Sequence, residues 1–324
     1  MVASLKRLMA PWILKAAIQK ALSGLPSSHT LNRVFQDRLT GSLDLDLTRI
    51  SDQLRRAARH LQAYRKIHGR LPGNVLEVGT GWFPVIPLGL HLCGCAEIHT
   101  VDRTQLMRRE DVQRTLSALA ALHREGRLSE ALPGFLSDRA ARLAEMARDL
   151  GRPGKQVDED AATILKRFGI HYEASSLEAL ALSEGSVDLT LTNSVLEHLR
   201  LAEIELLLRE LRRLSAASGV ASHFIDLGDH YAVFDRRVEV YNFLKFSDPV
   251  WSLINSRLHF QNRLRISDYR RLFEVTNWRT VEEASQRGTQ ADLAPIRLAP
   301  RFRSYRLEDL LVYRSWVTLA PNVP

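Results

Sequence analysis

The chain has 324 residues, 45% hydrophobic and 25% charged, with a net charge of +8 at pH 7. These values exclude a globally disordered chain and suit either one large core or one core with an appended subdomain. The 45 lysines and arginines are interleaved with acidic residues and accompany no aromatic-basic RNA motif or zinc finger, so we expect no nucleic-acid partner.

Three features bear on where the protein works. No apolar stretch is long enough to cross a membrane. Residues 1–22 mix basic and apolar side chains and predict an amphipathic helix that packs on its own domain, because a secretory signal needs an uninterrupted apolar core. Cys93 and Cys95 lie in one apolar run and indicate buried thiols in a reducing compartment. We therefore expect a cytoplasmic protein without a transmembrane segment.

Helical patterning dominates residues 1–70, the first predicted segment. Ser51 is the expected N-cap of a helix that Gly69 ends. Further helices are predicted over residues 83–92 and 267–273, and another ends at Leu214. Short apolar runs predict seven strands, at residues 74–78, 98–101, 170–174, 187–192, 220–225, 279–283 and 311–319.

Alternating strands and helices predict an α/β domain over residues 71–324, with a mainly parallel sheet. Residues 104–169 are helical and too long for one ordinary crossover between parallel strands. We interpret them as a helical insertion that forms a lid. Ligands in such sheets bind beyond the carboxyl ends of the strands, and the informative residues fall there.

Gly79 and Gly81 follow the first predicted strand, where glycine lets the backbone turn and approach a ligand closely. Asp102 ends the next strand, and a carboxylate there can accept both hydroxyls of a ribose. A nicotinamide-binding fingerprint needs a third glycine, and Pro84 occupies that position. The pattern therefore favours a nucleoside cofactor without phosphates over a dinucleotide.

A second motif, Ser194-Val-Leu-Glu-His198, follows the strand at residues 187–192, which carries Asp188 near its start. With Glu77-Val-Gly-Thr-Gly81 and Asp102, it resembles the class I S-adenosylmethionine-dependent methyltransferases over roughly residues 70–225. The resemblance implies a seven-stranded Rossmann-like sheet and S-adenosylmethionine as cofactor. The sequence departs from the family pattern at the missing third glycine.

The resemblance also implies cofactor contacts. Glu77 would act through the glycine loop, Asp102 would bind the ribose, and Asn193 and Ser194 would lie under the methionyl end. Ser175 or Ser176 would replace the usual residue near the adenine. The implied cofactor-binding residues are Glu77, Gly79, Thr80, Gly81, Asp102, Arg103, Ser175, Ser176, Asn193 and Ser194. We expect His198 to be a packing residue.

The acceptor side is expected within residues 226–275. His223, Asp226, Asp229 and His230 crowd just beyond the fifth predicted strand. They can supply a general base with a partner, bind a divalent cation, or form a polar loop with capping aspartates. We take His223 or His230 as the base, with Asp226 beside it, and expect no metal.

Downstream, Arg263 or Arg265 is the expected holder of an anionic acceptor. The leading hypothesis is a methyltransferase for a small-molecule or glycan acceptor, and a homo-oligomer is compatible with the sequence. The alternative is an enzyme that cyclises the aminobutyryl arm of S-adenosylmethionine and releases methylthioadenosine. A non-catalytic module, an RNA methyltransferase and a dehydrogenase fit the motifs less well.

Overall fold

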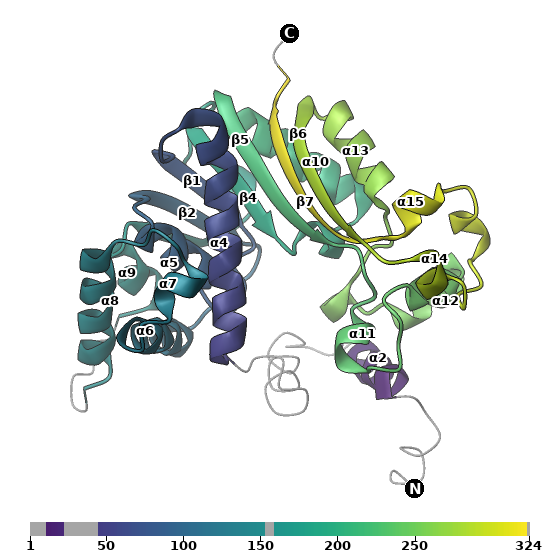
Figure 1. Ribbon diagram of the computed structural model, residues 1–324, viewed down its shortest axis with the longest axis horizontal. Coiled ribbons are helices and arrows are strands. Elements are labelled where there is room, and N and C mark those ends of the chain that lie inside the picture. Colours follow the sequence, from purple (N-terminus) through teal and green to yellow (C-terminus); the bar gives the residue numbers. More distant parts are fainter. Residues whose placement is uncertain (1–10, 23–44, 153–158, 323–324) are drawn as a thin grey trace, which may run out of the picture.

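The computed structural model describes residues 11–22, 45–152 and 159–322. Its centre is a seven-stranded sheet in the order β3-β2-β1-β4-β5-β7-β6 (Figure 1). Strands β1 to β5 run parallel, and β7 runs antiparallel to both β5 and β6. The strands are β1 (Asn74–Val78), β2 (Glu97–Asp102), β3 (Ile170–Ala174), β4 (Val187–Asn193), β5 (Ser215–Asp226), β6 (Trp278–Arg287) and β7 (Val312–Pro321). All seven predicted strands are present.

The helices cover both faces of the sheet. They are α2 (Pro11–Leu22), α4 (Leu47–His68), α5 (Val85–Leu92), α6 (Arg109–Arg124), α7 (Leu128–Ala131), α8 (Ser137–Leu150), α9 (Ala161–Lys166), α10 (Leu201–Leu214), α11 (Tyr231–Phe234), α12 (Asp248–Ile254), α13 (Ile266–Val275), α14 (Gln290–Leu293) and α15 (Leu307–Leu310). Short 3₁₀ turns are η1 (Leu177–Ala179), η2 (Leu196–His198), η3 (Asn242–Lys245), η4 (Arg257–His259) and η5 (Pro300–Phe302).

Alternate residues of each strand face opposite sides of the sheet and join different cores. In β1, Val75 packs with α4 and α5, whereas Leu76 packs with α10 and α13. Figure 1 shows α4 on one face of the sheet and α13 on the other. This alternation decides which helix layer each side chain of β4 and β5 meets.

Helix α4 begins earlier than the sequence predicts. Asp46, not Ser51, is the N-cap, and its carboxylate accepts the N–H of Arg49 at 2.8 Å. Ser51 lies one turn inside the helix, where its hydroxyl donates to Leu47 O. Gly69 ends the helix as predicted, in the left-handed conformation with a φ of +67°.

The predicted insertion at residues 104–169 contains α6, α7, α8 and α9. All four contribute buried apolar side chains to the core that they share with α4, α5 and the strands. These helices therefore form a wall beside β2 and β3. The sequence interprets them as a lid, but of the described residues in this range Thr104 and Leu106 alone line the cavity described below.

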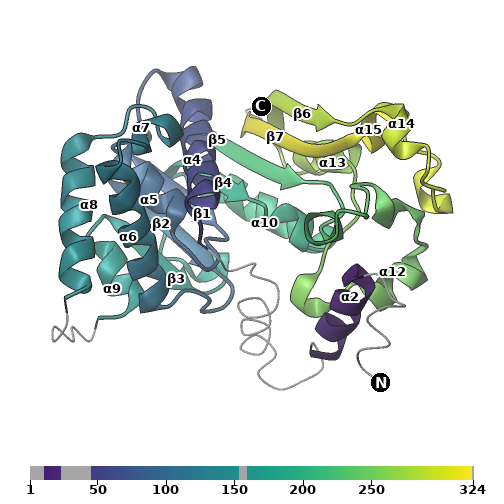
Figure 2. The same ribbon diagram turned by 60° about the horizontal axis from the view of Figure 1, so that its bottom comes forward.

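A third core lies at the other end of the molecule. It joins α2 to the chain between β5 and β7, and the tilted rings of Trp12 and Tyr231 have their centroids 5.5 Å apart. Figures 1 and 2 both show α2 beside α12, well apart from α4. The two described helices of residues 1–70 thus belong to different parts of the fold; residues 1–10 of the predicted first helix lie outside the described residues. Among those described, no helix has both the length and the apolar character to cross a bilayer.

Candidate cofactor and acceptor site

The loop after β1 needs glycine at two positions. Gly79 has a φ of +86°, and a Cβ on it would lie 2.4 Å from Cγ2 of Val195. Gly81 has a φ of +75° and open space where a Cβ would be, so only its backbone conformation requires glycine. The first glycine thus brings the β1 loop against the loop that follows β4.

Asp102 fastens the same loop to the end of β2. Its Oδ2 accepts the N–H of Gly81 at 3.1 Å. Burial raises the pKa of Asp102 to about 7, although the bond from Gly81 opposes this rise. The carboxylate is thereby fixed at the carboxyl end of the strand, where the sequence places the ribose contact.

Glu77 lies beneath the loop. It is 1% exposed and accepts the hydroxyl of Thr100 at 2.8 Å, and Thr100 in turn contacts the hydroxyl of Thr80. Burial raises the pKa of Glu77 to about 8. Since the carboxyl group meets only the loop and β2 through these bonds, its geometry fits an action through the loop.

A cavity of about 310 Å³ opens at the carboxyl ends of β1, β2 and β3. Five of the predicted cofactor residues line it: Gly79, Asp102, Arg103, Ser175 and Ser176. Arg103 lies at its rim and forms an ion pair of 2.9 Å with Glu203 of α10. Glu77, Thr80, Gly81, Asn193 and Ser194 are not among the lining residues.

Most of the remaining wall is apolar, and the sequence analysis did not identify it. The additional apolar lining residues are Val78, Val101, Leu106, Leu177, Val195, Leu199, Leu206 and Leu207. Val78 and Val101 are among the last two residues of β1 and β2, and Val195 comes two residues after β4; this closeness to strand ends is the signal that could have revealed them. A largely apolar cavity with one buried carboxylate, Asp102, fits an adenine and its ribose, so the residues present suit a nucleoside cofactor.

The profile of a methyltransferase domain family matches residues 131–222, which include β3, β4 and part of β5. The strand order, with antiparallel β7 between β5 and β6, is that of the class I fold. The matched segment is a methyltransferase domain, set in a sheet of the class I fold. Its cofactor is S-adenosylmethionine, as the resemblance implied. A search of curated protein sequences found no match.

Solved methyltransferase structures resemble this methyltransferase at low sequence identity. The 1,6-didemethyltoxoflavin N1-methyltransferase of Burkholderia thailandensis, solved with S-adenosylhomocysteine, aligns over 92% of both chains with 14% identity and a TM-score of 0.44. A Leishmania major enzyme aligns over 95% of this chain and 82% of its own, with 13% identity and a TM-score of 0.42. The methyltransferase spans 56% of a Nostoc punctiforme protein inferred to be an O-methyltransferase; the alignment covers 81% of this chain, with 14% identity and a TM-score of 0.38.

Asn193 and Ser194, at the end of β4, meet an arginine that the sequence analysis missed as a site residue. Arg56 of α4 donates to Asn193 Oδ1 at 3.3 Å and to Ser194 Oγ at 3.4 Å, and its guanidinium lies over Phe224. Ser194 has a φ of +56°, a strained conformation for a residue with a side chain. Burial lowers the pKa of Arg56. Helix α4 thus contacts, from outside the motifs, the two residues that the sequence places at the methionyl end.

His223 is a wrong prediction for the catalytic base. It lies within β5 rather than beyond it, is fully buried and faces α13, where its ring stacks 6.0 Å from Phe273. Thr192 Oγ1 lies 2.8 Å from its Nδ1, and burial lowers its pKa to about 3. Because the core closes around the imidazole, it cannot reach an acceptor in this arrangement.

Of the other acceptor-side candidates, Asp229 has a structural role. It accepts N–H bonds from Tyr231 and Asn242 and is 2% exposed. Asp226 ends β5, where it accepts the N–H of Gly228 and lies 3.6 Å from Nε of Arg314. Asp226 therefore stays at the strand end predicted for the acceptor.

His230 meets two residues of the second motif. Its ring lies 5.0 Å from that of His198, and one ligand atom from each of Glu197, His198 and His230 lies within 4.8 Å of the others. The sequence predicts His198 to be a packing residue, yet it belongs to this cluster. Burial raises the pKa of Glu197 to about 8 and lowers that of His198. Only spatial proximity reveals the cluster, because His230 is more than thirty residues away in the sequence.

Arg263 and Arg265 do not serve as predicted. Arg263 is 3% exposed and donates to Phe243 O and to Asp248. Arg265 is fully buried and donates to three backbone carbonyls, of Leu227, Leu310 and Val312. Their terminal nitrogens hold the chain between β5 and β7, and both side chains are buried, so neither presents a guanidinium to an acceptor.

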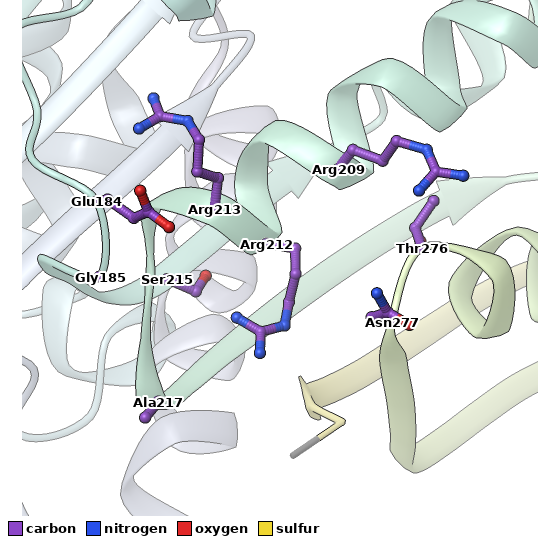
Figure 3. A pocket seen from close by; sticks show the side chains of 9 residues that line it. All are labelled: Glu184, Gly185, Arg209, Arg212, Arg213, Ser215, Ala217, Thr276 and Asn277. Atoms are coloured by element: carbon purple, nitrogen blue, oxygen red, sulfur yellow. The ribbon is translucent and has the colours of Figure 1, made fainter. Parts of the chain in front are cut away.

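A larger cavity, of about 430 Å³, lies at the opposite end of the sheet. Figure 3 shows its three arginines, Arg209, Arg212 and Arg213, pointing in different directions. Arg209 and Arg213 are paired with Glu205 and Glu210 of their own helix. This cavity lies at the amino end of β5 and shares no residue with the cofactor cavity.

Proposed function

We propose that the methyltransferase acts on a hydroxyl group of a compact small-molecule or glycan acceptor. One observation carries this proposal: ligand atoms of Glu197, His198 and His230 lie close together. Glu197 is only two residues after Val195, which lines the cofactor cavity. A hydroxyl oxygen is a weak nucleophile until a neighbouring group polarises or removes its proton. This cluster supplies such groups beside the cofactor.

Bound S-adenosylmethionine supplies a methyl group on a positively charged sulfur. Gly79 and Asp102 would hold its nucleoside end in the cavity, and Asn193 and Ser194, held by Arg56, would lie near its methionyl end. His230 would take the acceptor proton, with Asp226 at the neighbouring strand end. Arg56 and Arg314 would favour an acceptor that also carries a negative charge.

The test uses the full chain with isotopically methyl-labelled S-adenosylmethionine and a panel of phenols, hydroxy acids and sugars. We expect S-adenosylhomocysteine and a labelled product only with a suitable acceptor. The matched control is Gly79→Ala, which should form neither. Methylthioadenosine released from S-adenosylmethionine alone, above the enzyme-free level, would contradict the proposal and support the cyclising reaction.

A further inference from the structure

The cluster of Glu197, His198 and His230 combines two segments that are distant in the chain. Glu197 and His198 belong to η2, after β4, and His230 is the residue before α11. Among the described residues this is the one group of three such side chains whose ligand atoms approach within 4.8 Å. Metal–ligand bonds of about 2.0–2.2 Å place neighbouring ligand atoms about 3–4 Å apart, so small side-chain rotations would close the group around an ion.

The imidazole of His198 is oriented as in a metal ligand. Its Nδ1 lies 2.7 Å from the carbonyl oxygen of Phe260, which can only accept, so Nδ1 carries the proton. The lone pair is then on Nε2, on the other side of the ring. A backbone carbonyl that fixes the tautomer in this way is the usual partner of a ligating histidine.

Glu197 provides the second, independent observation. The residue is 1% exposed, and its Oε1 accepts the N–H of Asp226 at 3.3 Å. Its Oε2 is buried and has no hydrogen-bond partner among the described residues. An unpaired buried carboxylate oxygen is costly, by about 1–3 kcal/mol or more, and a cation would remove this cost.

We propose that Glu197, His198 and His230 bind a divalent transition-metal ion. Two imidazoles and one carboxylate suit iron, manganese, cobalt or zinc and leave coordination positions open. This proposal departs from the sequence-based expectation of no metal, and it stands without the proposed function.

The role of the ion in catalysis does rest on the proposed function. With the ion bound, His230 is a ligand and the ion takes its place in activating the acceptor: a hydroxyl at an open position would lose its proton to water more easily. The acceptor oxygen then bonds to the methyl carbon as the carbon–sulfur bond breaks, and the electron pair of that bond stays on sulfur. The products are the methyl ether, S-adenosylhomocysteine and the released proton. Neighbouring hydroxyls on the acceptor would chelate the ion, which favours catechol-like or sugar diol acceptors.

The experiment titrates the chelator-treated full chain with Co²⁺, follows the visible absorption bands of the ion and measures the bound metal by mass spectrometry. We expect one ion per chain. His230→Ala and Glu197→Gln should each weaken Co²⁺ binding by at least about tenfold. The matched control is His171→Ala: its ring stacks 4.8 Å from that of His99 and its Nε2 lies 3.1 Å from Glu97, yet these residues form no such group.

Calorimetric titration of each variant with S-adenosylmethionine serves as the control for folding, and we expect each to bind the cofactor. No Co²⁺ binding by the wild-type chain, or equal binding by His230→Ala, would overturn the metal site. Metal binding without methyl transfer to any acceptor would leave the site standing and count against the proposed function. Loss of binding in His171→Ala as well would indicate surface histidine binding and contradict the proposal.

Discussion

Gly79 and Val195 are in such close contact that a Cβ on the glycine would lie 2.4 Å from a methyl group of the valine. The contact joins the β1 loop to the loop that carries Glu197 and His198. The same contact therefore lies beside both the cofactor cavity and the cluster of Glu197, His198 and His230.

Gly79→Ala should abolish measurable S-adenosylmethionine binding and lower the melting temperature, because it adds a clash to a left-handed backbone. Removing the clash with Val195→Ala should restore part of the stability, but the strain of about 1–2 kcal/mol would remain. Gly126→Ala is the control, since Gly126 has a φ of +72° and nothing near its Cβ position. If Gly79→Ala and Gly126→Ala lowered the melting temperature equally, the clash with Val195 would be unimportant.

Asp102→Asn should make the protein more stable above neutral pH. The carboxyl group has a pKa near 7 when folded and an ordinary value near 3.8, so the folded state holds its proton more tightly. In wild type this contribution to stability declines as pH rises from about 4 to 7, and the asparagine variant lacks that decline. Denaturant unfolding at pH 5 and pH 8 measures the difference. If the free energy of unfolding changed equally with pH in wild type and Asp102→Asn, the shifted pKa would be contradicted.

The same substitution should weaken S-adenosylmethionine binding. Wild-type affinity should rise between pH 6 and pH 8 as Asp102 ionises and accepts the ribose hydroxyls. Asp102→Asn should bind about 10–100-fold more weakly at pH 8 and show a flat profile, because a charge-assisted bond is lost. Calorimetric titration across this range checks both, and parallel wild-type and variant profiles would exclude Asp102 as the ribose contact.

Arg56→Met should weaken S-adenosylmethionine binding by about tenfold or more. The methionine fills the space over Phe224 but no longer holds Asn193 and Ser194. Arg55→Met is the matched control, since Arg55 is exposed and pairs only with Asp52 of the same helix. If the two neighbouring substitutions had equal effects, a role for Arg56 at the methionyl end would be untenable.

Arg265→Met should lower the free energy of unfolding by about 3 kcal/mol or more, because three buried carbonyl groups lose their donor. The exposed Arg303→Met should change it by less than about 0.5 kcal/mol. Urea denaturation measures both values. A stable Arg265→Met protein with a poorer apparent acceptor affinity would instead revive the anion-holding role.

The sequence predicts the sheet well because strand signals are local. The strands at residues 74–78 and 170–174 were predicted to the residue, since an apolar run bounded by glycine or a turn defines each end. The start of α4 was misplaced because Ser51 and Asp46 are both good caps, and only the three-dimensional packing of Ile50 and Leu54 selects the earlier one.

Side-chain direction was harder to predict than strand position. His223 is polar and close to the strand end, but its place in the alternation of β5 points it into the core against Phe273. Arg56 comes from a helix that carries no motif, and the approach of His230 to His198 depends on how the chain folds back after β5. Such contacts between distant segments leave no periodic trace in the sequence.

The position of β7 has a consequence for how the sheet opens. Within the described sheet, β6 pairs only with β7, whereas β7 pairs with β5 on its other side. Backbone amide protons of β6 should therefore exchange with deuterated solvent earlier than those by which β7 is bonded to β5. Since Asp226 pairs with Arg314 between β5 and β7, the proposed acceptor end belongs to the slower-exchanging part of the sheet.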